Sequence, residues 1–200
     1  MPTREEQKEQ RRQLIIAKAL ELFATRGYSD TKIGDIAKAA DMSMGLMFHY
    51  FESKEQLYEE LVRMGAAYTN MPSELAYKDP LDYFEGFLQA LFRYAKEQPW
   101  VFHMFVLMAQ ARRSEGIPSQ IREIAMSVNQ IEQSAAIIRE GQQTGCIREG
   151  NPEALSFTFW SSVQGIMEQL AVSPQLLKQE EMMPQTDWVM DILRKSHIPA

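Results

Sequence analysis

Apolar residues recur every three or four positions along most of the chain, and no stretch shows the strict apolar–polar alternation of a strand. This pattern predicts an all-α fold of about nine helices, most of them amphipathic. The dipeptides Asp79-Pro80 and Asn151-Pro152 have the form of a cap followed by a first helical proline. The expected helices lie near residues 8–26, 33–40, 44–50, 54–70, 80–96, 100–112, 119–143, 152–171 and 185–197.

Two of these helices are short and lie close together between residues 33 and 50. The first can be capped by Thr31 and the second by Ser43, with a tight turn at residues 41–42. A third helix follows Ser53, which has the spacing of a capping box. Two short helices joined by a turn of about three to four residues form a helix-turn-helix, whose second helix enters the major groove of DNA. The sequence therefore predicts a DNA-reading unit.

The segment LFATRGYSDTKIGDIAKAADMSMGLMFHYFESKEQL resembles the TetR family of bacterial transcriptional regulators. The shared pattern has an aromatic-Gly-aromatic step, a Thr before the second helix, a Ser-x-Gly-x-x-aromatic-x-Tyr-Phe recognition helix and then Ser-Lys-Glu-x-Leu. The residues that carry it are Phe23, Gly27, Tyr28, Thr31, Ser43, Gly45, Phe48, Tyr50, Phe51, Ser53, Lys54, Glu55 and Leu57. The resemblance implies a homodimer that binds operator DNA through its N-terminal domains and a small ligand through its C-terminal domains.

We accordingly expect a three-helix helix-turn-helix DNA-binding domain at residues 1–54 and a larger helical ligand-binding and dimerisation domain at residues 55–200. The charge distribution fits this division. The first segment contains nine Lys and Arg against eight Asp and Glu, whereas the second contains twelve against nineteen. The acidity behind the net charge of −6 therefore lies in the C-terminal segment, and DNA specificity should depend on a few contacts.

The predicted DNA contacts come from helix N-termini and from the recognition helix. Free N–H groups at Thr31 and Ser43 can bind phosphate, and Gly45 leaves room for close approach. Met44 and Leu46 stand where the family commonly has Lys and Thr or Ser; they can touch thymine methyl groups or indicate recognition through DNA shape. The predicted DNA-binding residues are Thr31, Lys32, Ser43, Met44, Gly45, Leu46, His49, Tyr50 and Lys54. Phe48 and Phe51 are expected to pack between the helices instead.

The C-terminal segment is rich in aromatic residues and methionine, which either pack a core or line an adaptable apolar cavity. Core packing accounts for most of them from the residues alone, whereas the family resemblance favours the cavity, with polar contacts from His103 and Gln164. The predicted ligand-binding residues are Phe84, Phe87, Trp100, His103, Met104, Met108, Trp160, Gln164 and Met167.

Two later helices combine small and large apolar residues at helical spacing. They can pair within one chain or form a four-helix interface between two chains. The dimer is favoured because two reading helices about 34 Å apart can read a palindrome. The predicted interface residues are Val128, Ile131, Ala135, Ile138, Phe159, Ser162, Val163, Gly165 and Ile166.

The sequence lacks metal-ligand spacing of His and Cys, a phosphate-binding glycine loop and a Gly-x-Ser-x-Gly elbow. We therefore expect no enzymatic activity, no cofactor and no metal. No apolar run approaches the roughly 20 residues of a membrane span, the N-terminus is too charged for a signal peptide, and the single Cys146 fits a reducing compartment. These features predict a cytoplasmic protein.

The favoured function is a ligand-responsive dimeric repressor, released from a palindromic operator in double-stranded DNA by a small hydrophobic effector. An alternative is a TetR-like dimer that acts as a co-activator or partner adaptor with weak direct DNA readout, which Met44 and Leu46 motivate. A helical enzyme or a carrier of lipophilic molecules is a third hypothesis, and it predicts ligand binding without retention on DNA.

Overall fold

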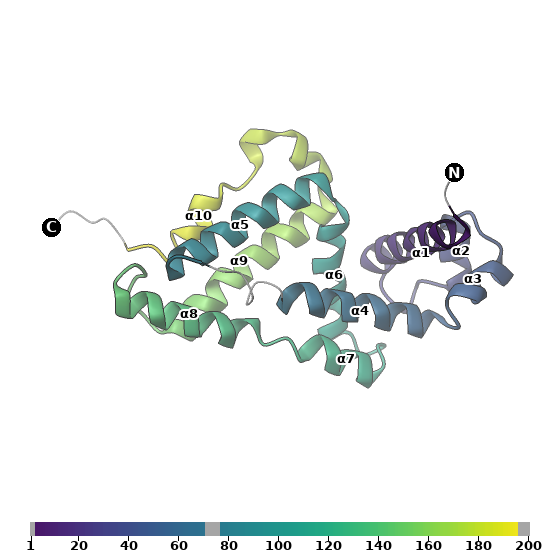
Figure 1. The fold of residues 1–200 in the computed structure, drawn as a ribbon, viewed down its shortest axis with the longest axis horizontal. Coiled ribbons are helices and arrows are strands. Elements are labelled where there is room, and N and C mark those ends of the chain that lie inside the picture. The colour runs from purple at the N-terminus through teal and green to yellow at the C-terminus, as the bar shows by residue number, and fades with distance from the viewer. Residues whose placement is uncertain (1–2, 71–76, 196–200) are drawn as a thin grey trace. The chain divides into compact units, whose positions relative to one another are not determined.

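The computed structural model describes residues 3–70 and 77–195, and within them the regular elements are all helical (Figure 1). The prediction of an all-α fold is confirmed. The α-helices are α1 (Arg4–Arg26), α2 (Ile33–Ala39), α3 (Met44–Tyr50), α4 (Lys54–Asn70), α5 (Pro80–Glu97), α6 (Trp100–Arg113), α7 (Ser119–Met126), α8 (Gln130–Thr144), α9 (Pro152–Val172) and α10 (Thr186–Met190). Two short 3-10 helices, η2 (Pro174–Lys178) and η3 (Glu180–Met182), lie between α9 and α10.

The helices pack into two compact units. Unit 1 consists of residues 1–67 and 103–127, and unit 2 of residues 68–102 and 128–200. Both α4 and α6 begin in one unit and end in the other. Packing thus groups α6 and α7 with the helix-turn-helix, and the functional division at residue 54 stays a prediction.

Local side-chain caps explain several helix starts. Asp79 accepts hydrogen bonds from the amides of Leu81 and Asp82 at 2.8 and 3.0 Å, and Asn151 accepts one from the amide of Ala154 at 2.8 Å. Both predicted cap–proline starts are confirmed. Helix α1 begins earlier than predicted because Thr3 forms a capping box with Glu6.

Two helix predictions in the C-terminal half of the chain need correction. The single helix expected at 119–143 is broken into α7 and α8, because Ser127 ends the first helix and Asn129 has non-helical backbone angles, with φ of −107° and ψ of 49°. Asparagine and serine favour such positions since their side chains bond to neighbouring groups. The helix expected at 185–197 ends at Met190, and residues 196 and 197 lie outside the described residues.

Each unit has its own apolar core. In unit 1 the fully buried side chains include Ile15, Phe23, Ile36, Met47 and Leu61. In unit 2 they include Phe84, Leu88, Ile138, Phe159 and Met167. Among the described residues, no helix is both long enough and apolar enough to cross a bilayer.

Candidate DNA-binding interface

The turn between α2 and α3 has the geometry of a helix-turn-helix. Asp41 adopts a left-handed backbone conformation, with φ of 54°, which aspartate tolerates better than most residues. The amide of Met42 donates to the carbonyl of Ala37 at 2.9 Å and closes the turn. The predicted turn at residues 41–42 is confirmed.

Helix α3 is attached to unit 1 by one side only. Met47 and the following Phe51 are 0% and 2% exposed, whereas Met44 and Phe48 are 41% and 49% exposed. The expectation that Phe48 packs between the helices is therefore wrong. Adjacent side chains on an α-helix point about 100° apart, so Met47 faces the core and its neighbour faces outward.

The first turn of α3 is well ordered and open on its outer side. Ser43 caps the helix, since its Oγ accepts a hydrogen bond from the amide of Leu46 at 3.3 Å. Gly45 is exposed, and a Cβ atom there would meet no heavy atom within 4 Å. Leu46 is half-buried. The side of α3 that faces away from the core thus combines Gly45 with the apolar Met44 and Phe48 and with the exposed His49.

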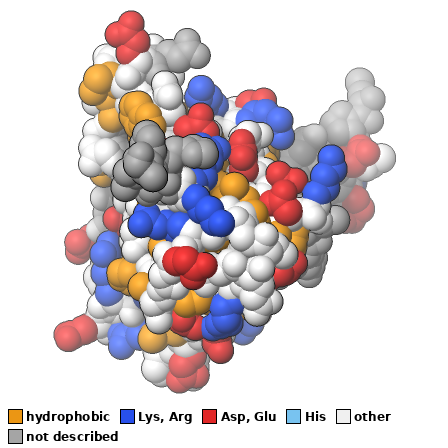
Figure 2. Space-filling model, turned by 90° about the vertical axis from the view of Figure 1, so that its left-hand side faces the viewer, with side chains coloured by type: hydrophobic (Ala, Val, Ile, Leu, Met, Phe, Trp, Pro, Cys, Tyr) orange, Lys and Arg blue, Asp and Glu red, His pale blue; other side chains and the backbone are white. Residues whose placement is uncertain are grey.

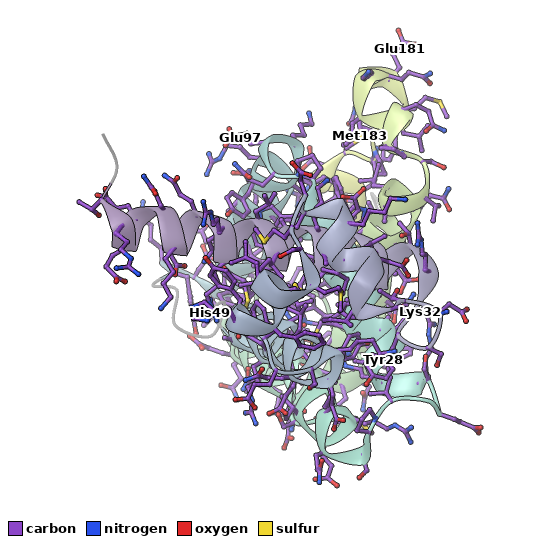
Figure 3. All side chains as sticks on the ribbon, turned by 90° about the vertical axis from the view of Figure 1, so that its right-hand side faces the viewer. Tyr28, Lys32, His49, Glu97, Glu181 and Met183 are labelled. Atoms are coloured by element: carbon purple, nitrogen blue, oxygen red, sulfur yellow. The ribbon has the colours of Figure 1, made fainter. Side chains whose placement is uncertain are left out.

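Thr31 does not cap α2, contrary to the prediction. It is fully buried, and its hydroxyl donates to the carbonyl of Gly27 at 2.7 Å, which stabilises the connection from α1. Lys32 occupies the cap position, and its amide donates to Asp35 Oδ2 at 3.2 Å. The Thr31 side chain is therefore closed off from solvent, whereas Lys32 is exposed at the start of α2 (Figure 3).

Lys54 is bound within unit 1 at the start of α4. Its Nζ donates to the carbonyl of Tyr28 at 2.7 Å and lies 4.1 Å from the centre of the Tyr28 ring. Burial lowers the pKa of Lys54, and the charge of Asp30 opposes that effect. The ammonium group thus joins the α1–α2 loop to α4, and its contact with phosphate stays a prediction.

His49 and Tyr50 lie at the C-terminal end of α3. His49 is exposed and Tyr50 is half-buried, with ring centres 5.9 Å apart (Figure 3). Together with Leu46 they line a groove of about 420 Å³ whose other wall is the first half of α1. Sequence reasoning missed this wall, although the spacing of its basic residues, Arg4, Lys8 and Arg11, was a visible signal.

The residues predicted to bind a ligand do not form one group. In unit 2, Phe84 contacts Phe159 with ring centres 5.0 Å apart, and Phe87 contacts Trp160 at 4.9 Å. Met167 of α9 is fully buried, and in the same helix α9 the Nε2 of Gln164 donates a hydrogen bond to Glu168 at 2.7 Å.

Other predicted ligand-binding residues have different neighbours. Trp100 contacts Tyr68 and Tyr94, with ring centres 5.6 and 5.9 Å apart. In unit 1, Met104 and Met108 pack on Gly65 of α4, so tightly that an added Cβ atom would lie 2.9 and 2.5 Å from their sulfur atoms. Their predicted role in ligand binding stays a prediction.

Two of the residues predicted to bind a ligand, Trp160 and His103, have polar or charged neighbours within the fold. The indole Nε1 of Trp160 donates to the buried Ser134 hydroxyl at 2.8 Å. Burial lowers the pKa of His103, and the nearby charge of Glu21 on α1 works in the opposite direction. The Trp160 indole therefore already has an acceptor that a bound ligand would have to share, and His103 lies near an acidic charge.

The predicted dimer interface is partly wrong. Ala135, Ile138, Phe159 and Val163 are all 0% exposed within unit 2, so their side chains hold α8 against α9 and cannot meet another chain. The remaining predicted residues are half-buried or exposed: Val128, Ile131, Ser162, Gly165 and Ile166. The helical spacing of apolar residues did not distinguish the sides on which α8 and α9 pack against each other from the sides that face solvent.

A short helix, held by a buried methionine and open on its outer side, is the arrangement of a helix-turn-helix. Residues 15–61 match the family model of the bacterial regulatory proteins of the tetR family. This match and the relatives below support a transcriptional regulator of the TetR family rather than an enzyme.

Three known proteins illustrate the similarity. The HTH-type transcriptional regulator RutR of Escherichia coli O157:H7 is 24% identical over 157 residues, which cover 77% of this chain and 72% of RutR. IcaR of Staphylococcus aureus strain Newman, a negative regulator of the biofilm operon icaADBC, is 36% identical over 56 residues, 28% of this chain and 30% of IcaR. The crystal structure of the MbdR regulator from Azoarcus sp. CIB has a TM-score of 0.75 at 19% identity and covers 93% of this chain and 98% of MbdR.

Proposed function

We propose that this protein is a dimeric repressor that binds a palindromic operator and is released by a small, largely apolar effector. The observation that carries the proposal is the outer side of α3, where Met44 and Phe48 are exposed and the neighbouring Gly45 is open. Exposed apolar side chains on a short helix are costly in water unless a partner covers them. Thymine methyl groups in the major groove are apolar partners of the right kind.

Dimerisation is supported by the outer side of α9. Phe157, Ser161 and Gly165 are spaced four residues apart and are all exposed, and Phe157 is 60% exposed. A Cβ atom at Gly165 would meet nothing within 4 Å, which leaves space for close approach of a second helix. We therefore place the interface on this side of α9 and on the exposed Ile131 of α8, in place of the four buried residues.

A route from an effector to the reading helix is supported by the packing of unit 1. Gln110 of α6 donates to the carbonyl of Ala24 in α1 at 3.1 Å, and Gly116 lies so close to Ser29 that an added Cβ would be 2.7 Å from its hydroxyl oxygen. Movement of α6 would therefore shift the helices that hold α3. For release, the effector must bind the two conformations with different affinity.

The effector class follows from the aromatic and methionine side chains of α5 and α9. The Phe84–Phe159 and Phe87–Trp160 contacts supply apolar, adaptable surface, and Ser134 supplies one hydroxyl. Such surroundings favour a ligand that is mostly apolar with few polar groups.

The test is selection of bound duplexes from a random pool with the full chain at near-physiological salt, combined with measurement of the mass in solution. We expect enrichment of an inverted repeat whose half-sites are about 34 Å apart, bound by two copies. No enrichment by a folded dimer would overturn direct readout and favour the adaptor role. Enrichment of a single half-site by a monomer would overturn the proposal of a palindromic operator.

A further inference from the structure

The first half of α1 extends beyond the part of the helix that packs in unit 1 (Figure 3). Burial begins at Ile15, and residues 3–11 are all exposed. At about 1.5 Å per residue, residues 4–14 form an overhang about 16 Å long. The capping box at Thr3, with its amide 2.6 Å from Glu6 Oε2, starts the overhang without help from the core.

Charges on this overhang are sorted by side. Arg4, Lys8 and Arg11 follow one another at spacings of four and three, so they form one row, here called the basic stripe. Ile15 comes four residues after Arg11 and is buried. The basic stripe is therefore the direct continuation of the side of α1 that packs onto the helix-turn-helix.

The other charged residues of the overhang are engaged elsewhere except Glu5, which is exposed and lines the same groove as the basic stripe. Glu6 belongs to the capping box, and Glu9 accepts a hydrogen bond from Gln13 at 2.6 Å. Arg12 pairs with Glu60 of α4, and its guanidinium lies 5.5 Å from the centre of the Phe51 ring. Among the described residues, none forms an ion pair with the basic stripe.

The basic stripe lies along the groove that it shares with α3. The groove is lined by the three stripe residues together with Glu5, Gln7, Leu46, His49 and Tyr50. Three cations face one carboxylate there, and neighbouring like charges at helical spacing repel one another, so the net positive groove favours a polyanion as partner. The face of unit 2 seen in Figure 2 differs, because basic and acidic side chains are intermixed there.

We infer that the basic stripe binds the sugar-phosphate backbone of duplex DNA beside the major groove that α3 reads. The inference rests on the proposed function, because the stripe and α3 share one groove and would meet the same duplex. Phosphate contacts of this kind add affinity and fix orientation but carry little sequence information. The operator footprint should thus extend beyond the bases that α3 contacts.

The test compares three full-length variants with the wild type on the selected operator and on a random-sequence duplex. The stripe variant is Arg4→Gln/Lys8→Gln/Arg11→Gln. The charge control, Arg93→Gln/Lys96→Gln/Lys178→Gln, removes three exposed cations of unit 2. The third variant, Arg4→Lys/Arg11→Lys, keeps the charge of the stripe. Glutamine is a good helix former, and circular dichroism confirms that each variant folds.

For the stripe variant we expect affinity to fall at least about tenfold on both duplexes, with the preference for operator retained. The slope of log K against log salt should become shallower by about 0.9 for each lost phosphate contact. The charge control and the lysine variant should keep the wild-type slope. An unchanged slope in the stripe variant, or an equal loss in the charge control, would overturn the inference.

The random-sequence duplex separates this inference from the proposed function. If the wild type enriches no sequence, the proposed function fails, yet the slopes on random duplex still decide whether the stripe binds phosphate. If an operator is enriched but the stripe variant binds it as the wild type does, only the stripe fails.

Discussion

Helices α3 and α9 are both rich in apolar residues, yet they place them in opposite surroundings. In the seven residues of α3 only Met47 is buried. In the 21 residues of α9 the buried set includes Phe159, Trp160, Val163, Met167 and Leu170. Apolar character alone therefore does not identify a core helix. A cluster of apolar side chains that stays exposed after folding, such as Met44 and Phe48, points to a partner, whereas a buried apolar side chain has already found its partner within the chain.

The largest expected effect tests this contrast with two phenylalanines. Phe159→Ala should lower the free energy of unfolding by about 3–5 kcal/mol, because it leaves a cavity in a closely packed core. Phe48→Ala should change it by no more than about 0.5 kcal/mol, since Phe48 is 49% exposed, but should weaken operator binding. Urea unfolding measures both. A similar loss of stability in the two variants would remove the distinction between the helices.

Sequence reasoning predicted the helix-turn-helix well because its signals are local. The caps at Ser43, Asp79 and Asn151 and the turn at Asp41 are each formed by residues within a few positions of one another. Local hydrogen bonds are determined by local sequence, so the ends of α2, α3 and α5 could be predicted closely.

The side on which a residue faces was harder to predict. Met47 and Phe48 are adjacent and both apolar, and only the packing of α1, α2 and α4 determines which one turns inward. The same holds for α8 and α9, where Val163 is buried and Gly165, two positions later, is exposed. The periodicity of apolar residues predicts which side of a helix is apolar but not which other helix covers that side. The covering helix depends on contacts between residues that are distant in sequence.

The buried side of α9 also contains a polar contact that can be tested. Ser134→Ala would leave the indole Nε1 of Trp160 without its acceptor at 2.8 Å and should cost about 1–3 kcal/mol of unfolding free energy. In the double variant Ser134→Ala/Trp160→Phe the loss should be smaller than the sum of the two single losses, because neither partner then needs a hydrogen bond. A double-mutant cycle by urea unfolding gives the coupling energy, and a value near zero would argue against the bond.

Gly45 on α3 gives a matched test of the exposed side. Gly45→Ala should stabilise the fold by up to about 1 kcal/mol, because alanine favours the helix and its Cβ meets no atom within 4 Å. The same methyl group should weaken operator binding by about tenfold, equivalent to about 1.4 kcal/mol, because it occupies space next to DNA. Gly86→Ala on α5, where the added Cβ also meets nothing within 4 Å, should bring the stability gain without the loss of binding. Equal operator binding by the two variants would mean that DNA does not contact α3 at Gly45.

The smallest expected effect concerns the histidine that lies within the fold. Burial lowers the pKa of His103, more strongly than the charge of Glu21 raises it. In the unfolded chain the histidine has its ordinary pKa of about 6.5 and takes up a proton at a higher pH than in the folded chain. The stability of the fold is therefore complete above about pH 6.5 and falls as the pH drops from there through the lower pKa of the folded chain. The His103→Gln variant should lose this dependence, a change of about 1 kcal/mol or less between pH 7 and 5 in urea unfolding. If His103→Gln instead retained the full dependence, another group would be responsible, and His103 would again be free to serve a ligand.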